Sequence, residues 1–485
     1  MKVSASDWLL LSPELFLTAA GCLVLCLSVA IGKAKEEFLG FLAVLLVGIT
    51  GILLAFVALS PEREKGAILG GMFVVDNFAI FFKFLILLSL VLAILASIRF
   101  VGEAPYPGGE YYALLLFTGV GMLFMVSGHN LVSIYVALEL MALSSYILAG
   151  YFKGEVKSTE AALKYFVLGA FSSGVLLYGL SLVYGYAGKM GLPELAAFFA
   201  ASSGEKSNML LVGILLILAG LLFKIAAVPF HVWVPDVYEG SPTPVTAFFS
   251  VGPKLAAYAI LARIFYVAFP KFYADWGLIV ALVAAATMIL GNLAALLQTN
   301  VKRMFAYSSI AHAGYALLGV LGFQTEFGLW GILIYLLAYT FMNFGAFALI
   351  IFLETRGYAA ESVSDFNGLA KRNMGAAVVM LLFLLSLAGI PPTAGFIGKY
   401  YLFTAAMKAG YAWLAVLAVL ASAVSLFYYF RIAAAMFFVD GERAKLRSSY
   451  ALTAAVGICA LGTIVVGIAP QPFVEALRAC VPLGR

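Results

Sequence analysis

Long apolar segments follow one another along nearly the whole chain, and they constrain its fold more than any other feature. A helix that crosses a bilayer needs about 20 mostly apolar residues. About fourteen segments of the 485-residue chain meet this length, at 12–31, 38–60, 73–98, 111–127, 130–151, 159–187, 209–230, 242–269, 275–297, 304–322, 327–353, 375–407, 411–438 and 450–469. Composition agrees, since 64% of the residues are hydrophobic and 11% charged, against roughly 45–50% and 25% in a soluble domain. The sequence therefore predicts an all-α polytopic membrane protein.

The polar connections between these segments are short, so no separate soluble domain is expected. Residues 192–201 (LPELAAFFAA) are too few to span and are typical of an amphipathic helix at the membrane interface. The first span lacks a small-residue cleavage site after a basic start. We therefore expect it to be retained and not removed as a signal peptide.

Lysine and arginine in the loops indicate the orientation, because they concentrate on the cytoplasmic side. The loops after odd-numbered spans carry Lys33, Lys35, Arg99, Lys153, Lys157, Lys302, Arg303, Arg356, Lys371, Arg372, Arg443, Lys445 and Arg447. The tails and the other loops carry fewer: Lys2, Arg63, Lys65, Lys189, Lys206, Lys271, Lys408, Arg478 and Arg485. With an even number of spans both termini share a side, which we expect to be the outer one.

Residues 216–256 place two lysines deep in apolar segments, each near a helix-breaking proline. The first segment runs into Lys224 and then meets Pro229, and the second carries Pro253 beside Lys254. Such prolines free backbone carbonyl groups that only a protein-lined or watered interior can satisfy. An ionisable group inside a membrane is costly and indicates function by default. A lysine near a helix end that reaches the headgroups remains the alternative.

A second interrupted segment, LAGIPPTAGFIGKYYLF, resembles the first. Pro391 and Pro392 break a long apolar run shortly before Lys399. Paired broken segments in two halves of a chain indicate an inverted-repeat transporter with sites near the midplane. The alternative is that membrane helices simply tolerate proline and glycine.

Glu139 is an acid near the middle of a span, in NLVSIYVALELMALSSY. An opposite charge beside a carboxyl group changes its pKa by roughly 1–3, and a change of one corresponds to about 1.36 kcal/mol. Moving one charge through 100 mV costs about 2.3 kcal/mol. Making and breaking one Glu–Lys pair is therefore the right size to drive a proton step, and a static structural ion pair is the alternative.

Lys224, Lys254 and Lys399 suit a proton relay, because a buried lysine can lose its proton whereas arginine cannot. His231 and His312 titrate near neutral pH and could link the lysines, unless they serve only as hydrogen-bond donors.

Five further charged residues lie in or near the spans. Lys164 lies about one turn into its helix, as a half-buried relay or as a lysine that reaches the interface. Lys83, Arg263 and Arg431 are expected to reach the interface or to be structural partners. Asp76, close to an interface, needs no special role.

Two kinds of partner find no support in the sequence. The net charge of +5 is small and lies in loops, so no nucleic acid is expected. Four cysteines and three histidines form no ligand pattern for haem, iron–sulfur or another metal. If the chain serves a redox enzyme, we expect the electrons to travel elsewhere.

Five motifs carry a resemblance to a known family: VALELMALSSYIL, EAALKYFVLGAFSSG, FKIAAVPFHVWVPDVYEGSPTPVTAFFSVGPKLA, VKRMFAYSSIAHAGY and GIPPTAGFIGKYYLF. Together they resemble the antiporter-like proton-channel subunits of respiratory complex I and of related Na⁺/H⁺ antiporter complexes. The opening LLLSPELFLTAAGCLVL and the AALKYFVLGAFSSG segment look most like the subunit N type of bacterial NADH–quinone oxidoreductase.

The resemblance implies fourteen helices with two inverted five-helix repeats and with helices 7 and 12 broken. Residues 1–110 would hold helices 1–3, 111–270 the first repeat, 271–440 the second repeat, and 441–485 helix 14 and the tail. The implied proton relay pairs Glu139 with Lys224, places Lys254 at the centre, and ends at Lys399, with His231 and His312 between.

The implied function is that of a proton-translocating membrane-arm subunit in the bacterial inner membrane, beside other antiporter-like and small membrane subunits. The chain would bind no cofactor itself, with FMN and iron–sulfur clusters in partner subunits and quinone acting elsewhere in the complex. A subunit of a multi-subunit Na⁺/H⁺ antiporter is the alternative. The N-terminal segment and the expected lack of an extra C-terminal domain favour the first.

Overall fold

The computed structural model describes residues 4–31, 36–61, 66–103, 106, 108–201, 207–354, 361–441, 449–478 and 480. Within these residues twelve helices are long and apolar enough to cross a membrane. They are α2 (Ser12–Ile31), α3 (Glu36–Leu59), α4 (Asn77–Gly102), α5 (Gly108–Ser127), α6 (Leu131–Ala149), α7 (Val156–Ala187), α11 (Thr243–Arg263), α12 (Tyr273–Leu296), α13 (Val301–Leu321), α14 (Glu326–Leu353), α18 (Ala412–Phe438) and α19 (Tyr450–Ile468). A π-helical turn, Ile264–Ala268, extends α11.

Two further predicted spans are each made of two shorter helices. The seventh, predicted at 209–230, consists of α9 (Asn208–Lys224) and of α10 (Trp233–Gly240), which lies beyond the predicted end of the span, and the twelfth consists of α16 (Met374–Ala388) and α17 (Ala394–Lys408). Twelve long helices and two interrupted ones match the fourteen predicted spans, and both breaks lie at the predicted prolines.

The backbone at each break is stabilised by specific contacts. After α9, Ala226 adopts a left-handed conformation with φ of 65°, and the Val228 N–H donates to Thr287 Oγ1 at 3.0 Å. After α16, Gly389 has φ of 86°, a conformation that glycine adopts without steric cost. The proline rings that follow cannot continue either helix.

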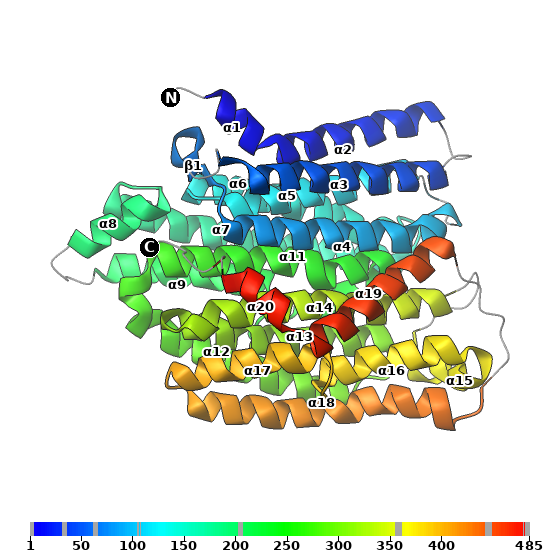
Figure 1. Cartoon of the computed structure of the whole chain (residues 1–485). Helices are drawn as coiled ribbons and strands as arrows, with labels where there is room; N and C mark the ends of the chain where they lie inside the picture. The colour runs from blue at the N-terminus through cyan, green and yellow to red at the C-terminus, as the bar shows by residue number, and fades with distance from the viewer. Residues whose placement is uncertain are drawn as a thin grey trace.

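The helices form one bundle with a clear centre and rim (Figure 1). The most apolar 18-residue stretch of α11 is wholly buried, and the corresponding stretches of α13 and α14 are 94% buried. The corresponding stretches of α2, α3, α7, α18 and α19 are only 28–39% buried. Large apolar side chains on the rim, such as Phe171 and Phe427, are exposed, as expected of surfaces that face lipid.

The remaining elements are short. They are α1 (Ala5–Leu10), α8 (Leu192–Ala201), α15 (Leu369–Arg372), α20 (Gln471–Arg478), an antiparallel pair β1 (Ala67–Ile68) and β2 (Phe73–Val74), and the 3₁₀ turns Leu69–Gly71, Pro270–Phe272, Gly322–Gln324 and Val363–Phe366. The short helix predicted at 192–201 is confirmed as α8. The third span was predicted to begin at 73, but β2 occupies this position and α4 begins after Asp76, whose side chain accepts from Ala79 N–H.

Both described ends of the chain approach the same end of the bundle. Asp7 in α1 accepts a hydrogen bond from Leu69 N–H at 3.4 Å, and Cys480 Sγ lies 3.5 Å from the Asn77 carbonyl oxygen. An even number of crossings requires this arrangement. Several loop residues that predict the orientation lie outside the described residues: Lys2, Lys33, Lys35, Arg63, Lys65, Lys206, Arg356, Arg443, Lys445, Arg447 and Arg485.

Candidate functional site

Three lysines and a histidine are buried on four different helices. Lys224 ends α9, Lys254 lies on α11, His312 on α13 and Lys399 on α17, and each is at most 6% exposed. A buried polar group costs free energy unless it finds partners. The contacts of these four residues therefore define the site.

Lys254 is held by one residue of the neighbouring central helix. Its Nζ donates to the Ser309 carbonyl oxygen at 2.8 Å and to Ser309 Oγ at 2.6 Å. Ser309 Oγ is also 2.8 Å from the Tyr339 hydroxyl. Lys254 is thus fixed at the centre of the bundle without a carboxylate partner among the described residues.

His312 lies one turn further along α13, between two tyrosines. Its Nδ1 is 2.5 Å from the Tyr335 hydroxyl, and its Nε2 is 3.2 Å from the Tyr429 hydroxyl. A small cavity of about 10 Å³ is lined by His312 and Lys254. This is close to the space that one water molecule needs.

Lys399 caps the helix that ends at the second break. Its Nζ donates to the carbonyl oxygens of Leu387 and Ala388, both at 2.9 Å, and to Ser422 Oγ at 2.7 Å. These carbonyls have no partner within α16 because the helix stops there. A cation at a helix C-terminus is also favoured by the helix dipole.

An aromatic ring connects Lys399 to the histidine. The Lys399 Nζ lies 4.8 Å from the centre of the Tyr315 ring, and the His312 and Tyr315 ring centres are 5.7 Å apart. The structure therefore brings Lys254, His312 and Lys399 together in one cluster.

Glu139 and Lys224 lie in the other half of the molecule. No direct ion pair joins them in the described part of the chain, although the Glu139 carboxylate is within electrostatic range of Lys224. The Lys224 Nζ lies 5.9 Å from the centre of the Tyr146 ring, and Glu139 Oε1 is buried without a hydrogen bond to a described residue. Their pairing stays a prediction.

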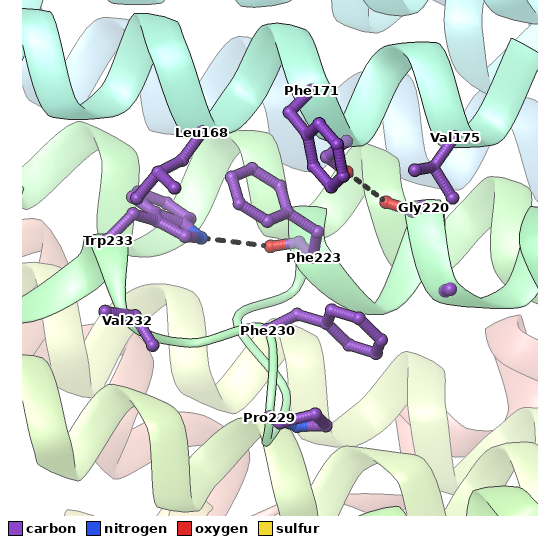
Figure 2. Close-up of a pocket in the computed structure, with 11 residues that line it drawn as sticks. Leu168, Phe171, Val175, Gly220, Phe223, Pro229, Phe230, Val232 and Trp233 are labelled. Atoms are coloured by element: carbon purple, nitrogen blue, oxygen red, sulfur yellow. Dashed lines mark hydrogen bonds between the residues drawn. The ribbon is translucent and has the colours of Figure 1, made fainter.

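The break after Lys224 borders an apolar pocket (Figure 2). The pocket has a volume of about 200 Å³ and lies between α7, α9 and the linking turn. Trp233 Nε1 donates to the Phe223 carbonyl oxygen at 3.2 Å across it. His231 lies in this turn and is only half-buried. No hydrogen bond between described residues joins it to Lys224 or Lys254, so its place in the relay also stays a prediction.

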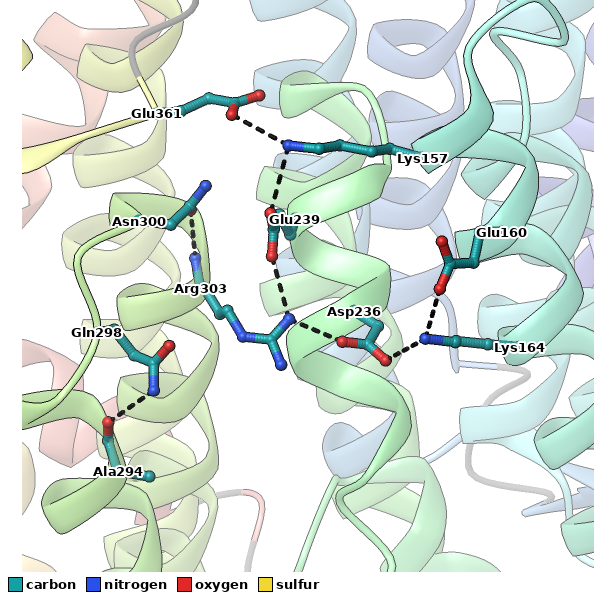
Figure 3. Close-up of polar contacts among 10 residues, drawn as sticks. All are labelled: Lys157, Glu160, Lys164, Asp236, Glu239, Ala294, Gln298, Asn300, Arg303 and Glu361. Carbon is teal, nitrogen blue, oxygen red and sulfur yellow. Dashed lines mark hydrogen bonds and ion pairs between the residues drawn. The ribbon is translucent and has the colours of Figure 1, made fainter.

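Lys164 belongs to a different kind of site from the buried lysines (Figure 3). Its side chain is 40% exposed, and its Nζ lies 2.7 Å from Glu160 and 2.6 Å from Asp236. Asp236 also contacts Arg303 at 2.7 Å. A further chain of ion pairs links Arg303 to Glu239, Lys157 and Glu361. Lys164 is thus part of an ion-pair network at the surface, and its role as a half-buried relay or as a lysine that reaches the interface stays a prediction.

Lys83 and Arg263 are structural partners, as one of the two expectations had it, but the sequence reasoning did not predict their acidic partners. Glu14 on α2 and Lys83 on α4 are fully buried and lie 2.5 Å apart. Asp76 pairs with Arg263 at 2.7 Å, so the prediction that Asp76 needs no special role was wrong. The pairs join α2 to α4 and the start of α4 to α11, which are not consecutive spans, so the sequence held no signal beyond the opposite charges themselves.

Arg431 is a structural partner, as one of the two expectations had it. Its guanidinium donates to the carbonyl oxygens of Leu296 and Gln298. These are the last carbonyls of α12 and of the turn after it, so Arg431 caps this helix.

Comparison with known proteins agrees with the motifs. Residues 128–425 match the family described as NADH:quinone oxidoreductase/Mrp antiporter, TM. The chain is 44% identical over 475 residues to NADH-quinone oxidoreductase subunit N of Trichlorobacter lovleyi, covering 97% of this chain and 96% of that protein. It is 45% identical over 492 residues to subunit N 1 of Koribacter versatilis, covering 98% and 96%.

Solved structures give the same answer for the fold. A chain of respiratory complex I from Thermus thermophilus with bound aureothin superposes with a TM-score of 0.82 at 31% identity, covering 96% of this chain and all of that one. A chain of the Mrp complex from Dietzia superposes with a TM-score of 0.85 at 24% identity, covering 99% and 97%, and is similar in fold. The chain belongs to the NADH:quinone oxidoreductase/Mrp antiporter family of membrane subunits, on its subunit N branch.

Proposed function

We propose that this chain is a proton-translocating membrane-arm subunit of a bacterial NADH–quinone oxidoreductase, located in the inner membrane. The observation that carries the proposal is the cluster of Lys254, His312 and Lys399, buried at the centre of the bundle and beside a helix break. Buried ionisable groups in a membrane mark proton or ion paths. The identity to subunit N over nearly the full length supports the same role.

The proton relay would run from Glu139 and Lys224 to Lys254, and on through His312 to Lys399, with His231 beside the first break. Each lysine can bind and release one proton, and its charge acts on the next across a medium of low dielectric constant. Protonation of Lys224 would favour proton loss from Lys254 through repulsion of like charges. Lys164, in the exposed ion network, would act at the entrance of this path.

The division of the chain follows from the two breaks. Residues 111–270 would form one repeat around the α9–α10 break, and 271–440 an inverted second repeat around the α16–α17 break. Residues 1–110 and 441–485 would flank them, with both termini on the periplasmic side. The central helices α11 and α13, which carry Lys254 and His312, would then join the two repeats.

The redox chemistry would belong to partner subunits. We propose that FMN and iron–sulfur clusters are bound there, that quinone reacts at another subunit, and that this chain contacts neighbouring antiporter-like and small membrane subunits. It would take part in the translocase as a non-redox subunit.

Point variants of the first pair test the proposal. Glu139→Ala and Lys224→Ala should each lower NADH-driven proton pumping in proteoliposomes, because each removes one partner of the proposed pair. Electron transfer from NADH to an artificial acceptor should be unchanged, since that reaction bypasses the membrane arm. Unchanged coupled pumping in both variants would exclude the relay assignment.

A multi-subunit Na⁺/H⁺ antiporter is the second candidate, favoured by the fold shared with the Mrp complex chain. Purification of a tagged chain from membranes in mild detergent, followed by mass spectrometry, separates the two. Flavin and iron–sulfur subunits in the eluate support the oxidoreductase. Small membrane subunits alone support the antiporter.

A further inference from the structure

Ser309 is the junction at which Lys254 meets other hydrogen-bonding groups. Lys254 reaches both the carbonyl oxygen and the hydroxyl of Ser309. The same hydroxyl lies 2.8 Å from Tyr339 on α14 and 3.5 Å from Tyr238 on α10. Four helices, including one half of the interrupted seventh span, therefore converge on a single buried hydroxyl group.

The carbonyl oxygen and the hydroxyl group of Ser309 both accept a hydrogen bond from Lys254, but they have different roles. The carbonyl oxygen accepts one hydrogen bond whatever side chain stands at 309, so it alone can keep the ammonium group in place. The hydroxyl can accept from Lys254 and donate onward. The Tyr339 hydroxyl has Ser309 as its hydrogen-bond partner within the described residues. Tyr339 lines the water-sized cavity together with His312 and with Lys254, whose ammonium group donates to Ser309.

We propose that the hydroxyl groups of Ser309 and Tyr339 carry the proton between Lys254 and this cavity, which would hold one water molecule on the way to His312. This inference rests on the proposed function and adds two relay residues to it. Serine and tyrosine are neutral side chains, so a search of the sequence for charged residues in the spans does not find them.

The transfer balances atom by atom. A proton passes from the Lys254 ammonium to Ser309 Oγ while the Ser309 hydroxyl proton passes to Tyr339 Oη. The Tyr339 hydroxyl proton passes at the same time to the water in the cavity. Each oxygen of the two side chains gains one proton and loses one, so Lys254 becomes neutral and one proton arrives in the cavity. Rotation of the two hydroxyl groups restores the starting arrangement.

Conservative variants in the intact complex test this assignment. Ser309→Ala and Tyr339→Phe each remove one hydroxyl and preserve the Ser309 carbonyl contact or the Tyr339 ring. We expect each to lower coupled proton pumping about tenfold, less than the 10²–10⁴ typical of a lost proton-transfer group, because water can partly replace a hydroxyl. Ser309→Thr retains the hydroxyl and should pump near the wild-type rate.

Thr340→Val is the matched control. Thr340 is buried next to Tyr339, and its hydroxyl bonds only to Leu336 of its own helix among the described residues. Its removal should leave pumping unchanged. If Ser309→Ala fails to assemble, Tyr339→Phe decides the question, because it removes only the terminal oxygen.

The possible outcomes distinguish a failure of this inference from a failure of the proposed function. Wild-type pumping in both Ser309→Ala and Tyr339→Phe, or an equal loss in Ser309→Thr, overturns the assignment of the hydroxyl groups. Lys254→Ala serves as the reference. If it abolishes pumping while the hydroxyl variants pump normally, only the further inference fails, whereas normal pumping in Lys254→Ala overturns the proposed function itself.

Discussion

Arg263 and Asp76 join α11 to the start of α4 through a bidentate ion pair. Arg263 Nη1 lies 2.7 Å from Asp76 Oδ2, and Nη2 lies 2.9 Å from Oδ1. Arg263 is 1% exposed and also donates to the Val126 carbonyl oxygen at 3.2 Å. Because α11 carries Lys254, this pair fixes the central helix against the N-terminal helices.

Replacing Asp76 should destabilise the protein strongly. Asp76→Asn leaves the Arg263 charge buried without a counterion, which typically costs about 3–5 kcal/mol. The thermal midpoint of the complex in mild detergent measures the effect. Because Asn can still cap α4 by accepting from Ala79 N–H, Asp76→Ala should be about 1 kcal/mol worse than Asp76→Asn. A midpoint within error of the wild type in Asp76→Asn would show that the ion pair contributes no stability.

The same pair gives a pH dependence with a defined sign. Burial opposes the charged form of Asp76, but the charge and hydrogen bonds of Arg263 outweigh it and lower the pKa of the carboxyl group. A lowered folded-state pKa stabilises the fold above the unfolded value of about 3.9 and loses that contribution as the pH falls through the folded value. The stability difference between wild type and Asp76→Asn should therefore be constant above about pH 5 and shrink in more acidic buffer. A difference that grows on acidification would contradict this sign.

The Glu14–Lys83 pair should behave as a unit. Glu14→Gln leaves a buried lysine unpaired, so we expect poor assembly and a loss of about 3–5 kcal/mol. The double variant Glu14→Leu, Lys83→Met removes both charges and should be less destabilised than either single variant, since apolar replacements of a buried pair are often tolerated. The yield of assembled complex and its thermal midpoint report this. Additive losses in the double variant would mean that the two residues act independently.

Lys399 should have two separable roles. Lys399→Arg retains donors for the carbonyl groups at the end of α16 but cannot lose its proton. We expect normal assembly and abolished coupled pumping. Lys399→Ala removes the cap as well, which costs about 0.3–1 kcal/mol more from the helix dipole alone. Coupled pumping at the wild-type rate in Lys399→Arg would show that deprotonation at this position is not required.

The breaks and the buried lysines could be predicted from the sequence because both are costly in a membrane. Pro229 and Pro391 interrupt apolar runs, and no other local feature explains a lysine beside each break. The positions of α9 and α17 followed directly. The apolar run, the proline and the lysine that define each break lie close together in the sequence, so the sequence alone is enough to locate the break.

The partners of the buried groups could not be predicted in the same way. Ser309 contacts Lys254 because α13 packs against α11, and Tyr335 and Tyr339 contact His312 because α14 packs against α13. Serine or tyrosine in a span carries no charge that would mark it. Glu14 and Asp76 lie near the ends of their spans, where the sequence alone is compatible with contact to water. Their pairing with Lys83 and Arg263 depends on which helices are neighbours.

The ion network around α10 has a mechanical consequence. Asp236 on this half-helix is paired with Lys164 of α7 on one side and with Arg303 of α13 on the other. A movement of α10 towards either neighbouring helix lengthens the ion pair with the opposite one, so the two ion pairs together hold α10 in place. The two ion pairs therefore connect α7 to α13 through α10, and they oppose a movement of α7 relative to α13.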